Sequence, residues 1–156
     1  MTQPIPPGFH SVSASLTFKD SKKALEFYKR AFGAKVLTVM DAPGGKGTMH
    51  ATMQIGNSIL MMGDEMGPQC PSAESMGGTP ITFYVYTENV DAFFSKAVQA
   101  GAKATMPVSD MFWGDRMGSL TDPFGYKWSI ATQTRVLTEE QVKKGAEAFF
   151  TSMSKK

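Results

Sequence analysis

The chain has 156 residues, which suits one domain or two small halves that share a hydrophobic core. Lysine plus arginine number 16 and aspartate plus glutamate 14, so the net charge of +2 is too balanced to indicate a protein that binds nucleic acid or an acidic membrane. The single cysteine, Cys70, excludes an internal disulfide, and the two histidines, His10 and His50, exclude a three-histidine metal site within one chain.

The start of the chain has neither a basic segment nor an apolar run, so we expect no signal peptide. No apolar stretch is long enough to span a bilayer, so no membrane partner is expected either. Together with the lone thiol, these features favour a cytoplasmic location.

The first predicted element is a strand over residues 10–18, where apolar and small polar side chains alternate. The next segment, DSKKALEFYKRAFG, spaces its apolar residues three and four apart and predicts a helix from Asp20 to Gly33. Asp20 or Ser21 is suited to cap its start, and Gly33 is suited to end it. Three further strands are predicted at 35–40, 48–55 and 58–62.

The second half of the chain repeats this order. A strand at 81–86 leads into the helical segment NVDAFFSKAVQAG, which Asn89 is suited to cap and Gly101 to end. The segment from Asp122 to Gly125, DPFG, is typical of a type I turn between two strands. The strands of this half are predicted at 104–108, 116–121 and 126–132. A repeat of this length indicates two copies of one supersecondary unit.

We therefore predict an α+β domain over residues 1–133, built from tandem βαβββ units at 8–63 and 80–133. A segment rich in Gly, Pro and Ser, residues 64–79, links the units. Helices outside and small polar side chains inside would make a curved mixed sheet around a concave cleft, which is where ligands are expected to bind.

A third amphipathic helix is predicted within residues 134–156. Thr138 and Gln141 have the spacing of a capping box at its start. Its apolar stripe must be buried, either against the same chain or against a partner. The stripe consists of Val142, Ala146, Phe149, Phe150 and Met153.

A duplicated βαβββ unit of this size resembles the vicinal oxygen chelate superfamily, which includes glyoxalase I, extradiol dioxygenases, fosfomycin-resistance enzymes and bleomycin-resistance proteins. The resemblance covers about residues 8–133. The stretches that carry it, PGFHSVSASLTFKDSKKALEFYKRAFGA, GTMHATMQIGNSILMMGDE and FWGDRMGSLTDPFGYKWSIAT, resemble the PhnB-like branch of that superfamily. The resemblance implies a small-molecule cleft and a homodimer, with the units paired within a chain or between chains.

Enzymes of this superfamily hold a divalent metal through His, Gln or Glu side chains on the first and last strand of each unit. The positions that match these ligands are Ser13, Leu60, Thr82 and Ser129. A leucine has no donor atom, and serine and threonine hydroxyls are weak neutral ligands. The resemblance therefore implies the fold and its cleft without the usual metal site, and no metal or other cofactor is expected.

Among the remaining polar residues, His50 shares the polar phase of its strand with Thr48, Thr52 and Gln54, and it is expected to project into the concave site. A histidine with an unperturbed pKa of about 6.5 suits a general base or a hydrogen-bonding anchor. The alternative is a structural histidine that bridges strands. His10, at the start of its strand and on the apolar phase, is interpreted as structural.

A second candidate group lies in the segment FWGDRMG, which places Trp113, Asp115 and Arg116 close together before a strand. An aromatic ring, a carboxylate and a guanidinium together are suited to hold a planar or anionic ligand. The alternatives are an internal Asp–Arg pair that holds a loop, or a dimer contact. Tyr84 and Tyr86 share the polar phase of their strand and either line the pocket or present hydroxyls to solvent.

These patterns favour a protein that binds a small, partly apolar molecule in its cleft without a metal, with His50 as a polar anchor. The first alternative is a metal-dependent lyase or dioxygenase-like enzyme with a non-standard site in which His50 is the best catalytic candidate. The second is a protein whose cleft serves assembly alone. The expected partners are a small-molecule ligand and a second copy of the chain in a homodimer, with no nucleic acid and no membrane.

Overall fold

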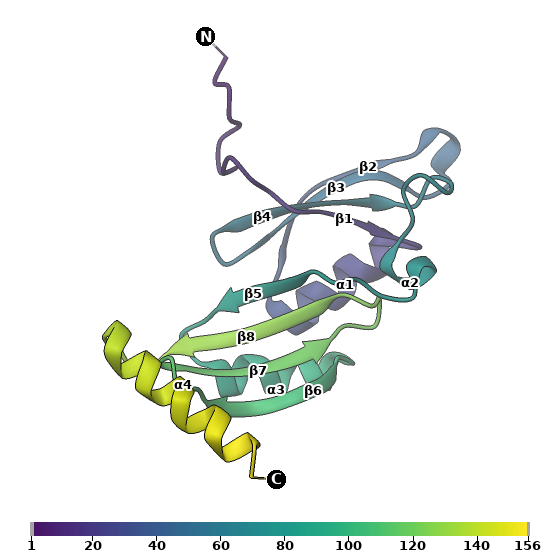
Figure 1. Ribbon diagram of the computed structural model, residues 1–156. Helices are drawn as coiled ribbons and strands as arrows, with labels where there is room; N and C mark the ends of the chain where they lie inside the picture. Colours follow the sequence, from purple (N-terminus) through teal and green to yellow (C-terminus); the bar gives the residue numbers. More distant parts are fainter. Residues whose placement is uncertain (1, 156) are drawn as a thin grey trace.

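In the computed structural model, which describes residues 2–155, the order βαβββ occurs twice and a terminal helix follows (Figure 1). The first unit contains β1 (Ser15–Phe18), α1 (Ser21–Phe32), β2 (Lys35–Asp41), β3 (Thr48–Ile55) and β4 (Ser58–Asp64). The second contains β5 (Thr82–Tyr86), α3 (Val90–Ala100), β6 (Lys103–Asp110), β7 (Asp115–Thr121) and β8 (Lys127–Gln133). The short η1 (Pro43–Gly45), α2 (Ala73–Met76) and the terminal α4 (Glu139–Met153) complete the fold. The predicted α+β class is confirmed.

Each unit forms its own four-stranded mixed sheet. The strand orders are β1-β4-β3-β2 and β5-β8-β7-β6. In each sheet one outer strand, β1 or β5, runs parallel to its neighbour, and the remaining pairs are antiparallel. Within residues 2–155 no ladder joins β1 to β5, so the mixed sheet is divided into two and does not close into a barrel.

The three long helices begin and end where their capping residues predict. The Asp20 side chain accepts a hydrogen bond from the first turn of α1, and Gly33 ends that helix in the left-handed region at φ 63°. Asn89 caps α3 in the same way. At α4, Thr138 and Gln141 form the predicted capping box, with side-chain to backbone distances of 3.2 and 2.9 Å.

Two strand positions differ from the prediction. β1 begins only at Ser15, because its register with β4 starts there, and Val12 before it is exposed. Thr48 was expected on the polar face of β3 but is fully buried. A register shift between Met40 and Asp41 on β2 interrupts the alternation at Thr48, whose backbone N–H is bound by the Asp64 carboxylate at 2.8 Å.

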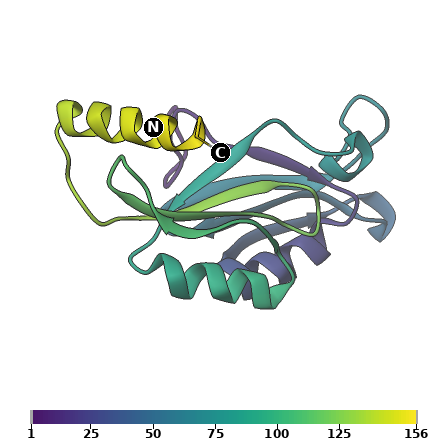
Figure 2. The same ribbon diagram turned by 60° about the horizontal axis from the view of Figure 1, so that its bottom comes forward.

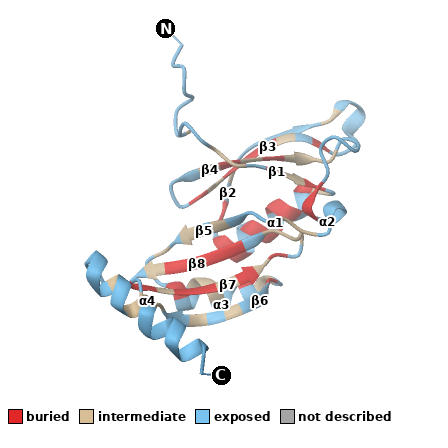
Figure 3. Ribbon diagram, viewed as in Figure 1, coloured by how far each residue is buried: buried red, intermediate tan, exposed pale blue. Residues whose placement is uncertain are grey.

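The helices are arranged in layers on the two sheets. α1 and α3 contact each other and lie on one side of the sheets, whereas α4 lies on the opposite side of the second sheet (Figure 2). Burial concentrates on α1 and the central strands, whereas α4 has no buried residue and is coloured only pale blue and tan in Figure 3. No helix among residues 2–155 is long and apolar enough to cross a membrane.

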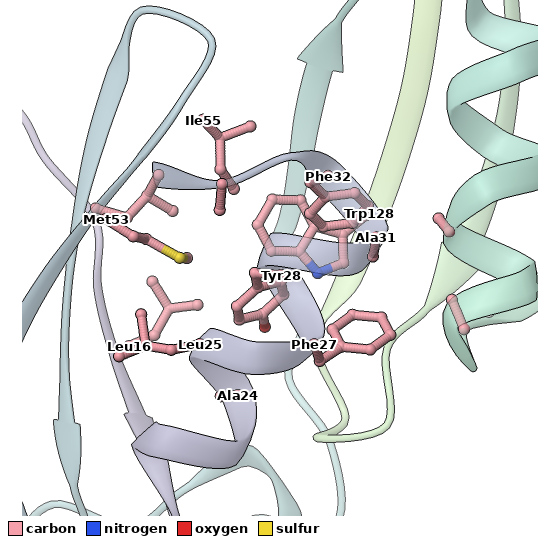
Figure 4. Packing of buried hydrophobic residues seen from close by; sticks show 14 of the residues in the cluster. Leu16, Ala24, Leu25, Phe27, Tyr28, Ala31, Phe32, Met53, Ile55 and Trp128 are labelled. Carbon is pink, nitrogen blue, oxygen red and sulfur yellow. The ribbon is translucent and has the colours of Figure 1, made fainter. Parts of the chain in front are cut away.

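α1 supplies the centre of a hydrophobic core that both units share. Met53 and Ile55 of β3 pack on one side of the helix, and Trp128 of β8 reaches it from the second unit (Figure 4). The ring centroid of Trp128 lies 5.5 Å from that of Tyr28 and 4.7 Å from that of Phe32. Burial of these large side chains is the main force that holds the units together.

A buried carboxylate ties α1 to the second unit. Asp122, in the turn between β7 and β8, is only 4% exposed. Its Oδ2 accepts hydrogen bonds from the Tyr28 hydroxyl at 2.5 Å and from the Trp128 indole at 2.8 Å. Its Oδ1 accepts the backbone N–H groups of Phe124 and Tyr126 at 2.9 and 3.0 Å. Burial raises the pKa of the Asp122 carboxyl, and the four donors oppose that rise.

The outer edge of β1 is also tied to the second unit. The Tyr126 hydroxyl accepts the Thr17 backbone N–H at 3.1 Å and donates to the Thr17 carbonyl at 2.8 Å. One side chain of the second unit thus satisfies both backbone groups of a strand residue that has no partner strand on that side. This contact fixes the end of β1 that lies next to the β7–β8 turn.

Replacing Tyr28 with Phe keeps the aromatic ring in the core and removes one donor from the buried Asp122 carboxylate. We predict that the free energy of unfolding falls by about 1–3 kcal/mol, the cost of leaving such a group underbonded. Urea denaturation followed by circular dichroism measures it. Ser58→Ala, which removes an exposed hydroxyl, should stay within about 0.5 kcal/mol of the parent. A Tyr28→Phe protein as stable as the parent would contradict this account of Asp122.

Candidate functional site

A cleft of about 570 Å³ lies between the two units. It is bordered by the segment before β1, the hairpin that joins β3 to β4, and the strand β5 with the loop after it. Its volume falls within the range of about 300–1,000 Å³ typical of small-molecule sites. The cleft is therefore large enough for an organic molecule of moderate size.

The floor of the cleft is apolar and its rim is polar. Phe83, Phe93 and Trp128 contribute rings, and the centroids of Phe83 and Trp128 are 4.8 Å apart. Trp128 lies at the base of this floor, where it is only 1% exposed and its indole N–H is donated to Asp122. Polar groups around the cleft come from His10, which was predicted to be structural, and from Ser13, Asn57, Ser58, Tyr84, Tyr86, Thr87 and Glu88.

The floor was missed by the prediction from sequence. Phe83 and Val85 occupy the apolar phase of β5, which was expected to face only the helices, whereas the cleft was assigned to the polar phase. β5 is an edge strand, and the cleft takes residues from both of its faces, including Tyr84 and Tyr86. Because an edge strand has no neighbour on one side, side chains from both of its faces can line a cleft there. A single sequence does not show which strand lies at the edge of a sheet.

The residues that match the family's metal-ligand positions are divided between two places. Ser13 and Leu60 line the cleft. Thr82 and Ser129 line a separate hollow of about 340 Å³ on the second sheet, where the Ser129 hydroxyl lies 3.0 Å from that of Ser119. Leu60 has no donor atom, so this set does not fit a divalent metal. Within residues 2–155 no three His, Cys, Asp or Glu side chains lie close enough together to hold a metal ion.

His50 is half-buried near the start of β3. Its neighbour Ala51 is buried in the core beside α1, so His50 lies on the sheet face that α1 leaves uncovered, opposite Met40 of β2. It is not among the residues that line the cleft. Its roles as an anchor, as a catalytic base and as a structural residue remain open predictions.

Asp115, at the start of β7, lies at the centre of a cluster of aromatic side chains. Its Oδ2 accepts hydrogen bonds from the Tyr84 hydroxyl at 2.9 Å, the Tyr86 hydroxyl at 3.1 Å and the Trp113 indole at 3.1 Å. Burial, together with the hydrogen bond to and the charge of Asp115, raises the pKa of Tyr84 to about 12. Tyr84, which was predicted apart from Trp113 and Asp115, thus lies together with them.

Arg116 does not join this cluster, because successive residues of a strand point to opposite faces. Its Nε and Nη2 bind the two carboxylate oxygens of Asp91 at 2.8 Å each, and its Nη1 lies 3.3 Å from Asp110. These bonds lower the pKa of Asp91. The predicted grouping of Trp113, Asp115 and Arg116 around one ligand is therefore divided, and the predicted internal Asp–Arg pair forms with different aspartates.

The chain is similar to one known family and to several proteins without an assigned function. The model of the Glyoxalase/Bleomycin resistance protein/Dioxygenase superfamily matches residues 9–130. An uncharacterised protein of Mycobacterium tuberculosis is 34% identical over 136 residues, which cover 85% of this chain and 79% of that protein. An uncharacterised protein of Arabidopsis thaliana is 30% identical over 124 residues, covering 75% of this chain and 74% of that one.

Solved structures agree with the fold. TioX from Micromonospora sp. ML1 superposes with a TM-score of 0.64 at 27% identity, over 80% of this chain and 98% of TioX. An Arabidopsis thaliana gene product reaches 0.60 at 28% identity, over 78% and 96% of the two chains. A PhnB protein from Bacillus cereus reaches 0.64 at 19% identity, over 79% and 99%, which supports the fold alone.

The Asp115 cluster predicts a specific change in tyrosine ionisation. A tyrosinate at position 84 would stand beside the Asp115 carboxylate, and this repulsion helps to hold its pKa near 12. In Asp115→Asn the charge is gone, so the pKa of Tyr84 should fall toward the ordinary value of about 10. Titration of labelled tyrosine by NMR measures it, with Asp110→Asn as the charge-matched control. An unchanged Tyr84 pKa in Asp115→Asn would contradict the contact.

Proposed function

The chain belongs to the glyoxalase/bleomycin resistance protein/dioxygenase superfamily, and we propose that it binds a small, partly apolar molecule in the cleft between its two units, without the metal site usual in that superfamily. The observation that carries this proposal is the cleft itself, with its apolar floor and polar rim. Pockets that combine apolar walls with a few polar groups are typical of small-molecule sites.

The cleft defines the kind of ligand it suits. The half-buried rings of Phe83 and Phe93 favour a planar or aliphatic part, which gains by leaving water. The hydroxyl of Ser13 and the carboxylate of Glu88 at the rim suit hydroxyl or amide groups on the same molecule. Because His50 lies outside the lining, we assign the polar contacts with the ligand to the rim residues. The anchoring role of His50 stays a prediction.

The residues at the family's metal-ligand positions favour ligand binding without a metal. The positions that match the family's ligands are occupied by Ser13, Leu60, Thr82 and Ser129, which lie in two separate hollows. Neutral hydroxyls and a hydrocarbon side chain cannot together replace the carboxylate and imidazole ligands of a divalent ion. The fold therefore supplies a shaped apolar site in place of a chelating one.

Filling the cleft tests the proposal. Ser13→Trp places an indole in the lining, whereas Ser11→Trp adds the same side chain two residues earlier, at an exposed position outside the lining. We expect an anionic naphthalene dye to bind the parent saturably, and Ser13→Trp to weaken that binding at least about tenfold, because the indole occupies the volume. Ser11→Trp should bind as the parent does. Equal affinity in all three proteins would overturn the cleft as the site.

Metal analysis of freshly purified protein tests the alternative enzyme. We expect no stoichiometric divalent ion and the same metal content in parent and His50→Ala. One divalent ion per chain that is lost in His50→Ala would support the alternative, a metal-dependent lyase or dioxygenase-like enzyme. It would contradict a binding protein without a metal.

We also propose that the chain forms a homodimer through α4. None of the fifteen residues of α4 is buried, and Phe150 and Met153 on its apolar side are exposed. The side chain of Phe149 packs against the loop before β7, with its ring centroid 5.5 Å from that of Phe112. An amphipathic helix in this position needs cover, and a second copy supplies a matching apolar surface.

Phe150→Glu introduces a charge into that face without altering the core of the chain. We expect sedimentation velocity to show a dimer for the parent and a monomer for the variant, since a buried unpaired carboxylate is costly. Lys144→Glu, at an exposed position outside the apolar stripe of the helix, serves as a charge-changing control. A parent protein that sediments as a monomer would remove this proposal.

A further inference from the structure

Asp115 is a buried carboxylate that lacks a positively charged partner. It is 4% exposed, and within residues 2–155 no lysine, arginine or histidine forms an ion pair with it. The adjacent guanidinium of Arg116 is taken up by Asp91 and Asp110. Burial of a carboxylate is costly unless a cation or several hydrogen-bond donors replace the lost water.

The donors that Asp115 does have leave one of its oxygens free. All three hydrogen bonds from Tyr84, Tyr86 and Trp113 end on Oδ2, and no side chain among residues 2–155 donates to Oδ1. Asp122 provides the contrast, because its two oxygens share four donors from the protein. Asp122 is therefore satisfied by the chain itself, whereas Asp115 has capacity for one more donor.

The rings around Asp115 remain reachable from solvent. Tyr84 is 44% exposed, Tyr86 64% and Trp113 38%. The centroids of Tyr84 and Tyr86 are 5.2 Å apart with planes inclined at 49°, so the two rings lie next to each other. Aromatic faces carry negative electrostatic potential, and they attract a cation within about 6 Å. The ring faces and the carboxylate therefore both attract a positive charge.

The chemistry of the cluster selects among cations. A divalent metal needs several oxygen or imidazole ligands, and this cluster offers one carboxylate whose neighbours are donors rather than acceptors. An organic ammonium group needs only the ring faces and one acceptor oxygen. The predicted anionic ligand is not suited to the cluster, because the guanidinium that would attract it points to the other face of the strand.

We propose that Asp115, Tyr84, Tyr86 and Trp113 form a binding site for the ammonium group of a small molecule, with the cation against the ring faces and Asp115 Oδ1. The site is distinct from the inter-unit cleft, because neither Asp115 nor Trp113 lines that cleft. It adjoins the cleft through the two tyrosines, which contribute to both. A ligand that carries an amine at one end of an apolar body would reach both sites.

A matched pair of probes tests the charge directly. Choline carries a trimethylammonium group, and 3,3-dimethylbutan-1-ol is its neutral isostere. Titration of each into ¹⁵N-labelled protein follows the indole N–H of Trp113, which donates to Asp115, with the buried Trp128 as internal reference. We expect choline to shift the Trp113 resonance saturably and the neutral alcohol to bind at least about tenfold more weakly. Equal effects of both probes, or no saturable shift, would overturn the proposal.

Variants separate the site from the rest of the molecule. Asp115→Asn should weaken choline binding at least about tenfold, whereas Asp110→Asn, which removes the same charge from an exposed position, should leave it unchanged. Ser13→Trp should leave choline binding within about twofold while it weakens dye binding in the cleft at least about tenfold, so failure of one proposal is distinguishable from failure of the other. Full choline affinity in a folded Asp115→Asn protein would refute the site. A shift of the Trp113 indole resonance that follows dimer formation and not choline binding would also refute it.

Discussion

Asp122 is buried in the turn between β7 and β8, and its carboxylate receives hydrogen bonds from both βαβββ units. Burial of a charged group is costly unless donors replace the lost water, and here four donors do so. One of them is the hydroxyl of Tyr28 on α1, the helix at the centre of the shared core. If α1 moved relative to the second unit, it would leave this carboxylate underbonded, so the two units are held in one relative position.

That position determines the cleft. Trp128 donates to Asp122 from its indole N–H, contacts α1 with one side of its ring and contributes another part to the cleft floor. The same side chain therefore links the buried carboxylate, the core and the site. Asp115, the second buried carboxylate, differs because its three donors all end on one oxygen and its rings stay partly exposed. Full satisfaction of Asp122 indicates a structural role, whereas the free oxygen of Asp115 is the basis of the binding role that we propose for it.

Local features were predictable from the sequence and longer-range contacts were not. The caps Asp20, Asn89 and Thr138 act within one turn of their helices, so their chemistry could be identified directly. Arg116 was grouped with Asp115 because they are adjacent, yet strand alternation separates them and the true partner, Asp91, lies on α3. The floor of the cleft and the convergence of Tyr84 and Trp113 on Asp115 depend on which strands become neighbours, and sequence spacing does not encode that.

The central claim is that Asp122 and its donors fix the relative position of the two units, which burial of the shared core holds together. Hydrogen exchange of the Trp128 indole N–H tests it most directly, because that proton lies in the bond to Asp122. The account predicts exchange only through global unfolding, with a free energy of opening equal to the free energy of unfolding from denaturation. Exchange through a local opening of much lower free energy, while the amides of β3 and α1 stay protected, would contradict it.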